Sequence, residues 1–159
     1  MSDRIEHTIG AFIYKQAKVL LLGSLPSPKS REVGFYYGHP QNRFWKVLAK
    51  VFDEPVPETV DDKKCFLISH RIALWDVIES CEIDGASDAS IKDVKSNDIL
   101  SAIEGTEIVK IFTTGKTAHA LLKRYRGIDS VCLPSTSPAN CSVSFELLVE
   151  KYSEILNYV

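Results

Sequence analysis

Long hydrophobic runs are missing from this 159-residue chain, and so is a large excess of charge of either sign. No apolar stretch approaches the ~18 residues of a membrane-spanning helix, so we expect no membrane segment. The first ten residues lack the apolar core of a secretory signal, so we expect a cytoplasmic protein. The formal net charge of −2 argues against a histone-like binder but not against a local basic patch.

Metal-ligand spacing is missing as well. The four cysteines, Cys65, Cys81, Cys132 and Cys141, lie far apart, and none forms a C-x-x-C pair. This argues against zinc and iron–sulfur sites, and no two histidines have ligand spacing either. We therefore expect no metal or other cofactor, and reduced cysteines that are mostly buried.

What the chain does have is an ordinary globular composition, with 45% hydrophobic and 25% charged residues. It is long enough to bury one core, and it contains no internal repeat, low-complexity tract or linker. We therefore predict one domain over residues 1–159.

Strand-like and helix-like segments alternate along the sequence. We expect strands within 18–27, 73–78, 107–115 and 129–133, helices within 39–52, 96–105, 116–125 and 143–159, and loops at 53–62 and 79–90. The alternation predicts an α/β sandwich with a mainly parallel sheet. Ligands bind at the carboxyl ends of such strands, where the loops 23–42 and 133–140 follow the first and last expected strands.

Basic side chains gather in two segments. Residues 29–50 carry five basic side chains and one acidic one, residues 116–126 carry four basic and no acidic ones, and the rest of the chain is left with −10. One interpretation is solvated helix faces, and the other is a surface that follows phosphates. Phe35, Tyr36 and Tyr37 are consecutive in the first segment, where an aromatic ring could stack on a planar ligand.

Two short patterns suggest other chemistry but match it poorly. G-K-T at 115–117 lacks the first glycine of a P-loop, since Lys110 occupies that position. G-S-L-P-S is not the G-x-S-x-G of a hydrolase. Ser24, His39 and Asp76 could still converge, so a small-molecule hydrolase remains an alternative.

Three motifs in order carry a specific resemblance: G-S-L-P-S at 23–27, F-Y-Y-G-H-P-Q-N-R-F-W-K-V-L at 35–48 and L-P-S-T-S-P-A-N at 133–140. They resemble the uracil-DNA glycosylase superfamily, including its mismatch-specific thymine/uracil branch. The likeness is closer to the hypoxanthine-DNA glycosylase (DNA-deoxyinosine glycosylase) group, which the segment 73–91 also resembles. It extends from about Val19 to the final helix.

The resemblance implies a three-layer α/β/α sandwich around a four-stranded, mainly parallel sheet. It implies a monofunctional glycosylase that hydrolyses the N-glycosidic bond of deaminated bases in DNA, hypoxanthine in the closest group and uracil in the wider superfamily. The expected partner is DNA containing such bases, and the protein is expected to be a nucleoid-associated monomer. The alternative is a non-catalytic binder of nucleic acid or nucleotides on the same fold.

The resemblance also suggests a catalytic residue. The asparagine that holds water in the mismatch-specific branch aligns with Leu25, which cannot hold it. The nearest amide is Asn42, so the resemblance implies that Asn42, at a helix start facing the pocket, positions the attacking water. The helix N-terminus would favour the departing base or a phosphate nearby. The alternative is that Asn42 only caps the helix.

Other site residues follow from the same motifs. Tyr37 aligns with the aromatic that stacks on the extruded base, with packing against Trp45 as the alternative. The other residues expected at the base are Ser24, Leu25 and Ser135. The expected DNA contacts are the loop residues Ser135, Thr136, Ser137, Pro138, Ala139 and Asn140, together with His39, Arg43 and Lys116.

Two positions in that loop depart from relatives. Thr136 lies near the place of the histidine that contacts the base oxygen in uracil-specific members, so strict uracil selectivity is not expected. Ala139 is small for an intercalating wedge, so strong insertion into the duplex is not expected.

Overall fold

The computed structural model describes residues 3–6, 9–84 and 88–159. Its centre is a four-stranded parallel sheet with the strand order β3–β2–β6–β7. The strands are β2 (Val19–Gly23), β3 (Ile72–Asp76), β6 (Lys110–Thr114) and β7 (Val131–Leu133). The predicted fold class is confirmed, and each of the four predicted strand regions overlaps one of these strands, although β3 begins one residue before its predicted region.

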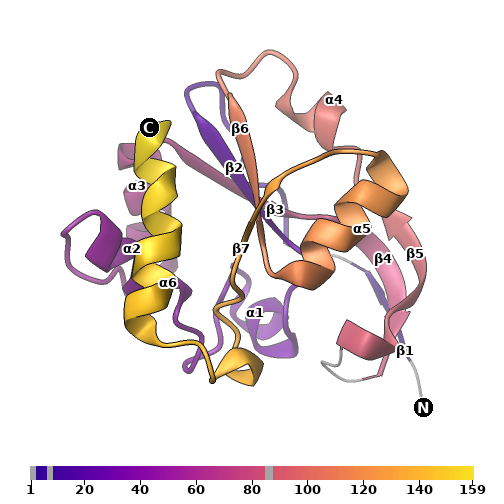
Figure 1. Cartoon of the computed structure of the whole chain (residues 1–159). Helices are drawn as coiled ribbons and strands as arrows, with labels where there is room; N and C mark the ends of the chain where they lie inside the picture. The colour runs from indigo at the N-terminus through magenta and orange to yellow at the C-terminus, as the bar shows by residue number, and fades with distance from the viewer. Residues whose placement is uncertain (1–2, 7–8, 85–87) are drawn as a thin grey trace.

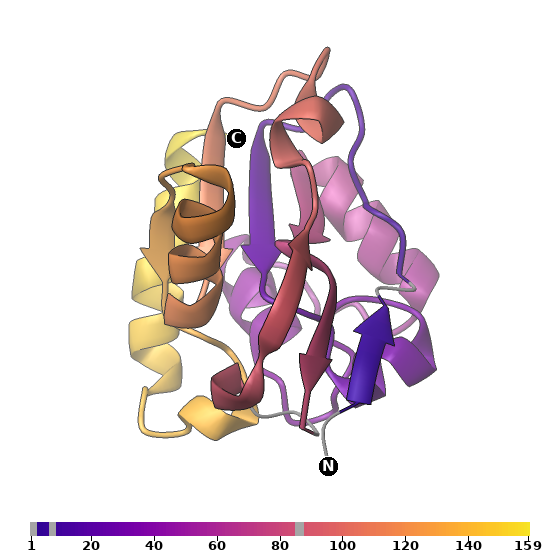
Figure 2. The same cartoon turned by 90° about the vertical axis from the view of Figure 1, so that its right-hand side faces the viewer.

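Helices cover both faces of this sheet (Figures 1 and 2). On one face lie α2 (Phe44–Val51), α3 (Val60–Ser69) and α6 (Phe145–Tyr152), which continues into η3 (Ser153–Asn157). On the other face lie α4 (Ile99–Ile103) and α5 (Lys116–Arg126). Because both faces are covered, β2 is buried along its whole length, as its unbroken apolar sequence predicts.

The alternation of side chains along each strand divides the core in two. Val19 and Leu21 belong to the larger core under α2, α3 and α6, whereas Leu20 and Leu22 belong to the smaller core under α4 and α5. In β3, Ile72 and Leu74 face the larger core in the same way. This regular alternation determines which side chains reach the sheet's carboxyl end on each face.

A second sheet has the order β1–β4–β5 and is formed by β1 (Asp3–Glu6), β4 (Ile78–Ile83) and β5 (Lys92–Ser96), with η1 (Asp88–Ser90) before β5. The prediction of a loop at 79–90 is wrong where β4 forms, and residues 85–87 of that loop lie outside the described residues. Register shifts in β4 interrupt the alternating pattern that would have indicated a strand.

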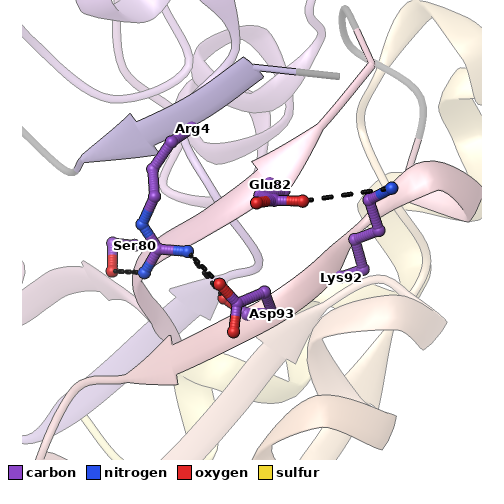
Figure 3. A network of polar contacts seen from close by, with 5 residues as sticks. All are labelled: Arg4, Ser80, Glu82, Lys92 and Asp93. Carbon is purple, nitrogen blue, oxygen red and sulfur yellow. Dashed lines mark hydrogen bonds and ion pairs between the residues drawn. The ribbon is translucent and has the colours of Figure 1, made fainter. Parts of the chain in front are cut away.

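Polar contacts link the three strands of this second sheet (Figure 3). Arg4 donates to Asp93 Oδ2 over 2.6 Å and to Ser80 Oγ over 2.9 Å, and Lys92 Nζ lies 3.9 Å from Glu82 Oε2. The ion-paired groups are largely exposed, so each pair contributes little to stability. The network therefore orients the strands more than it stabilises them.

Several boundaries differ from the prediction. A helix within 23–42, α1 (Pro28–Val33), was not expected, although Ser27 caps it by accepting from the Ser30 N–H over 3.1 Å. The helix expected from residue 39 begins only at Phe44. Residues 39–42 form a turn instead, in which the Asn42 N–H donates to the His39 carbonyl over 2.9 Å.

The cysteines are less buried than predicted. Cys65, Cys132 and Cys141 are exposed and Cys81 is buried, and all four are free thiols. The prediction of mostly buried cysteines is therefore wrong. Within the described ranges, none of the helices is both long and apolar enough to span a lipid bilayer.

We predict that Tyr152→Phe lowers the free energy of unfolding by about 1–3 kcal/mol, the cost of leaving a buried acceptor without its donor. The Tyr152 hydroxyl is buried and donates to the Pro134 carbonyl over 2.7 Å, which joins α6 to the segment after β7. Urea denaturation measures the change. Tyr125→Phe, at an exposed position of α5, is the control, and equal stability of the two variants would contradict the prediction.

Candidate functional site

A cleft of about 840 Å³ opens at the carboxyl ends of β2, β3 and β6. Its walls come from the segment 23–42, from the segment 135–139 and from Ile83 of the second sheet. Figure 2 shows β2 ending at the side of the molecule where α1 and the segment after β7 lie. This is the position at which parallel α/β sheets bind ligands, as the sequence predicts.

A polar row forms the floor of the cleft. Asp76, Gly23 and Thr114 end β3, β2 and β6 and line the cleft. Each lies two residues beyond an apolar side chain of the larger core, namely Leu74, Leu21 and Phe112. Strand alternation therefore follows the core residues, one row later on the same face of the sheet, with the Asp76 carboxylate, the Thr114 hydroxyl and, between them, Gly23 without a side chain.

Gly23 allows these groups to come close together. A Cβ on Gly23 would lie 2.6 Å from Asp76 Oδ1, 3.4 Å from the Tyr37 hydroxyl and 3.7 Å from Thr114 Oγ1. The first distance is shorter than side chains tolerate, so the Asp76 carboxylate occupies the space that a larger residue would fill. Asp76 is 3% exposed, which makes it a buried acid at the cleft floor.

Tyr37 is held in an uncommon backbone conformation at the cleft wall. Its φ of 53° lies in the left-handed region, which costs a non-glycine residue about 1 kcal/mol. Its ring stacks on Phe44, with centroids 3.8 Å apart and planes 13° apart, and its hydroxyl lies 2.8 Å from Thr114 Oγ1. Burial raises the pKa of this hydroxyl, and the charge of Asp76 raises it further.

Asn42 lines the cleft directly before α2, and its carboxamide orientation follows from its partners. Its Oδ1 accepts the Phe44 backbone N–H over 2.9 Å and the Thr136 hydroxyl over 2.8 Å. Because a backbone N–H can only donate, the atom facing it must be the oxygen. That oxygen has both lone pairs occupied, so the amide nitrogen is the group left for a ligand.

The segment 134–141 is fastened to the start of α2. The Arg43 N–H donates to the Thr136 carbonyl over 3.1 Å. The Arg43 guanidinium donates to the carbonyls of Val143 over 2.6 Å and Asn140 over 3.1 Å. Asn140 Nδ2 donates to the Ser135 carbonyl over 2.9 Å, which closes the segment on itself.

Most of the residues predicted for the site line the cleft, and two basic residues that were not predicted line it too. The predicted residues that line it are Ser24, Leu25, Tyr37, His39, Asn42, Ser135, Thr136, Ser137, Pro138 and Ala139. Lys29 and Arg31 line it as well. Arg43, Asn140 and Lys116 do not line it, and the first two are bonded within the protein. Their contact with DNA stays a prediction.

Leu25 contributes an apolar wall. It packs against a small cluster formed by Ile78, Cys81 and Ile83 of β4. Leu25 lines the cleft and packs on β4 at the same time, so an apolar side chain stands where the resemblance aligns an asparagine.

Sequence reasoning did not select Asp76 or Thr114 for the site. The available signal was the strand alternation, which continues from Ile72 and Leu74 to Asp76 on one face. Asp76 was considered only as a member of the alternative hydrolase site with Ser24 and His39. All three residues line the cleft. His39 Nδ1, however, accepts the Gln41 N–H over 3.1 Å, and no hydrogen bond joins Ser24 to His39 in the described part of the chain. Among the described residues, Ser24 and His39 therefore do not form a nucleophile–base pair.

Metal ligands do not gather in this site. Across residues 3–6, 9–84 and 88–159, no three His, Cys, Asp or Glu side chains are arranged to hold a metal ion.

Comparison with known proteins gives consistent results. The family model "Uracil DNA glycosylase superfamily" matches residues 11–158. A hypoxanthine DNA glycosylase of Methanosarcina acetivorans is 32% identical over 140 residues, which cover 86% of this chain and 89% of that protein. Another from Methanosarcina barkeri is 31% identical over 132 residues, covering 80% and 84%.

A solved structure is also similar. It is a solution NMR structure of a Methanosarcina acetivorans protein described provisionally as a uracil DNA glycosylase. The TM-score is 0.77 at 28% identity, and the match covers 95% of this chain and 98% of that one.

We predict that Gly23→Ala lowers the free energy of unfolding by about 1–3 kcal/mol, because the new methyl group must displace the Asp76 carboxylate. The matched control is Gly10→Ala, where a Cβ meets nothing within 4 Å. That variant should be neutral or gain up to about 1 kcal/mol, since alanine restricts the unfolded chain. Urea denaturation compares them, and a Gly23→Ala protein as stable as Gly10→Ala would refute the close approach.

Proposed function

Because the chain belongs to the uracil DNA glycosylase superfamily, we propose that it is a monofunctional DNA glycosylase. It hydrolyses the N-glycosidic bond of a deaminated base, hypoxanthine first and uracil second, in base excision repair. The observation that carries the proposal is the cleft itself, in which the amide of Asn42 and the ring of Tyr37 meet at the carboxyl ends of the strands. The relatives named hypoxanthine DNA glycosylases support the choice of base.

The chemistry requires the base to leave the duplex. A stacked and paired base cannot be reached, so the nucleotide must be extruded into a pocket. An 840 Å³ cleft is large enough for a purine nucleoside. Bond cleavage then builds positive charge on the sugar and negative charge on the base, so the transition state needs placed donors and a placed water more than a covalent nucleophile.

Asn42 supplies that placement in our proposal. Its Oδ1 is already held by two donors, so its amide N–H groups are available to the water oxygen. Water that attacks a sugar with cationic character needs correct positioning, which an amide donor provides without a change of charge. The structural role of Asn42 at the start of α2 and its catalytic role are compatible, because Oδ1 accepts the Phe44 N–H and the amide nitrogen faces the water.

Tyr37 supplies the stacking surface. One face of its ring is covered by Phe44, and its hydroxyl is held at Thr114, so the ring cannot rotate freely. A ring fixed in this way loses little entropy when a base stacks on it. Stacking on an aromatic side chain is worth ~1–3 kcal/mol per base and tolerates different bases.

DNA contacts are assigned to the two rims of the cleft. One rim is the segment 135–139 without the buried Thr136 side chain, and the other carries Lys29 and Arg31. Basic side chains beside a cleft fit a phosphate backbone that passes over it. DNA would therefore cross from α1 to the segment after β7, with the extruded nucleotide between them.

We predict that an oligonucleotide with a single deoxyinosine breaks at that position after incubation with the protein and treatment with hot alkali. A strand with deoxyuridine is expected to break more slowly, and the same strand with deoxyadenosine should stay intact. Gel electrophoresis of a panel of one-lesion oligonucleotides measures the products. Tight binding of the lesion strands with every strand left intact would favour the alternative, a non-catalytic binder.

We predict that Asn42→Ala lowers the single-turnover rate by ~10²-fold or more, as loss of a positioned catalytic group does. This change also removes the acceptor of the Phe44 N–H at the start of α2, so Asn42→Ser is the matched variant, because a serine hydroxyl can accept from a backbone N–H at a helix start as asparagine does. Both variants should lose activity, while Asn42→Ala alone should lose about 1 kcal/mol of stability. Wild-type rates in Asn42→Ser would leave Asn42 only the structural role of accepting the Phe44 N–H.

A further inference from the structure

Thr136 lies in the segment predicted to contact DNA, but its side chain is almost fully enclosed. It is 1% exposed, whereas Ala139 in the same segment is exposed. A hydroxyl in that position is poorly placed to meet a phosphate or a base edge. Within the described residues, the Thr136 hydroxyl donates to Asn42 Oδ1 over 2.8 Å and has no other hydrogen-bond partner.

The geometry around Asn42 shows what this bond accomplishes. The Phe44 N–H alone would hold Asn42 Oδ1 by one donor and leave the carboxamide free to swing about that contact. The Thr136 hydroxyl supplies the second donor from a different part of the chain, 94 residues away in sequence. Two donors on one oxygen fix the plane of the carboxamide and leave only its nitrogen to the cleft.

The backbone of Thr136 is fixed independently of its hydroxyl. Its carbonyl accepts the Arg43 N–H over 3.1 Å, and the neighbouring Ser135 carbonyl is held by Asn140. Removing the hydroxyl should therefore leave the segment in place. This separates the effect of the one bond from the effect of the segment as a whole.

We propose that Thr136 is a positioning residue, whose hydroxyl fixes the carboxamide of Asn42 with its amide nitrogen facing the nucleotide. The assignment rests on the proposed function, because it acts through Asn42. It gives Thr136 a role that needs no contact with DNA. It also makes the segment 134–141 part of the catalytic geometry as well as of the binding surface.

The test compares Thr136→Val, which removes the hydroxyl and keeps the shape, with Thr136→Ser, which keeps the hydroxyl and removes the methyl group. Single-turnover cleavage of the deoxyinosine strand should fall about tenfold in the valine variant, the rate equivalent of one net hydrogen bond. The serine variant should stay within about twofold of wild type, as should the Kd of every variant for DNA. Thr136→Ala is measured beside them in case valine perturbs folding.

A double-mutant cycle makes the assignment specific. If Thr136 acts through Asn42, Thr136→Val should cause no further loss in a protein that already carries Asn42→Ala. A full tenfold loss in that background would overturn the proposal. So would equal losses in the valine and serine variants, a loss expressed as weaker DNA binding, or a valine variant with the wild-type rate.

A measurement that does not depend on enzymatic activity tests the role of Thr136 separately from the proposed function. The side-chain amide signals of Asn42 in a ¹H–¹⁵N spectrum should shift or broaden in Thr136→Val and in Thr136→Ala, and stay in place in Thr136→Ser. A wild-type protein inert on every lesion would contradict the proposed function. Unchanged Asn42 signals in the valine and alanine variants would overturn the role of Thr136, whatever the activity.

Discussion

The hydrogen bond between the Thr136 hydroxyl and Asn42 joins the two halves of the site. One half follows β2 and leads into α2, and the other follows β7 and leads into α6. The parallel sheet places the starts of these two segments at the same edge, but it forms no bond between the segments themselves. The bond at Asn42, together with the bonds of Arg43 to the same segment, makes one rigid frame of two loops that are distant in sequence.

This frame explains why polar residues crowd in front of Phe44 and Trp45. Phe44 and Trp45 are buried and anchor α2 in the larger core. Asn42 and Arg43, immediately before them, cannot enter that core, and they bond instead to the segment after β7. His39 stabilises the preceding turn by accepting the Gln41 N–H. Phe44 and Trp45 therefore anchor α2 in the core, and the polar residues before them form part of the cleft.

The regular part of the fold could be predicted from the sequence because its signals are local. Unbroken apolar strands and amphipathic helices predict the parallel sheet and its two helix layers, and α5 begins at Lys116 as predicted. The second sheet was missed because β4 has an irregular register and contains two glutamates among its six residues. Its structure depends on pairing with β1, which is more than 70 residues away and which no local pattern reveals.

The site was predictable to the extent that motifs describe it. The motifs indicated Asn42, Tyr37 and the Ser/Pro segment, and these residues do line one cleft. The motifs could not show that the Arg43 guanidinium donates to backbone carbonyls or that the Thr136 side chain is buried. Both facts depend on contacts between segments that are distant in sequence. The net charge of each segment could not show the orientation of Arg43 either. A charge count includes Arg43 whether its guanidinium faces solvent or bonds to backbone carbonyls.

Only Val77 separates β3 from β4, so the strand that ends at the floor of the cleft continues almost at once into the sheet that forms its side wall. The N–H groups of Val77 and Ile78 are bonded to the carbonyls of Gly23 and Ser24, which ties this corner to the neighbouring strand as well. Floor and wall cannot move apart without breaking the sheet. The backbone of this corner therefore sets the distance between the floor and this wall, so the cleft is preformed on that side.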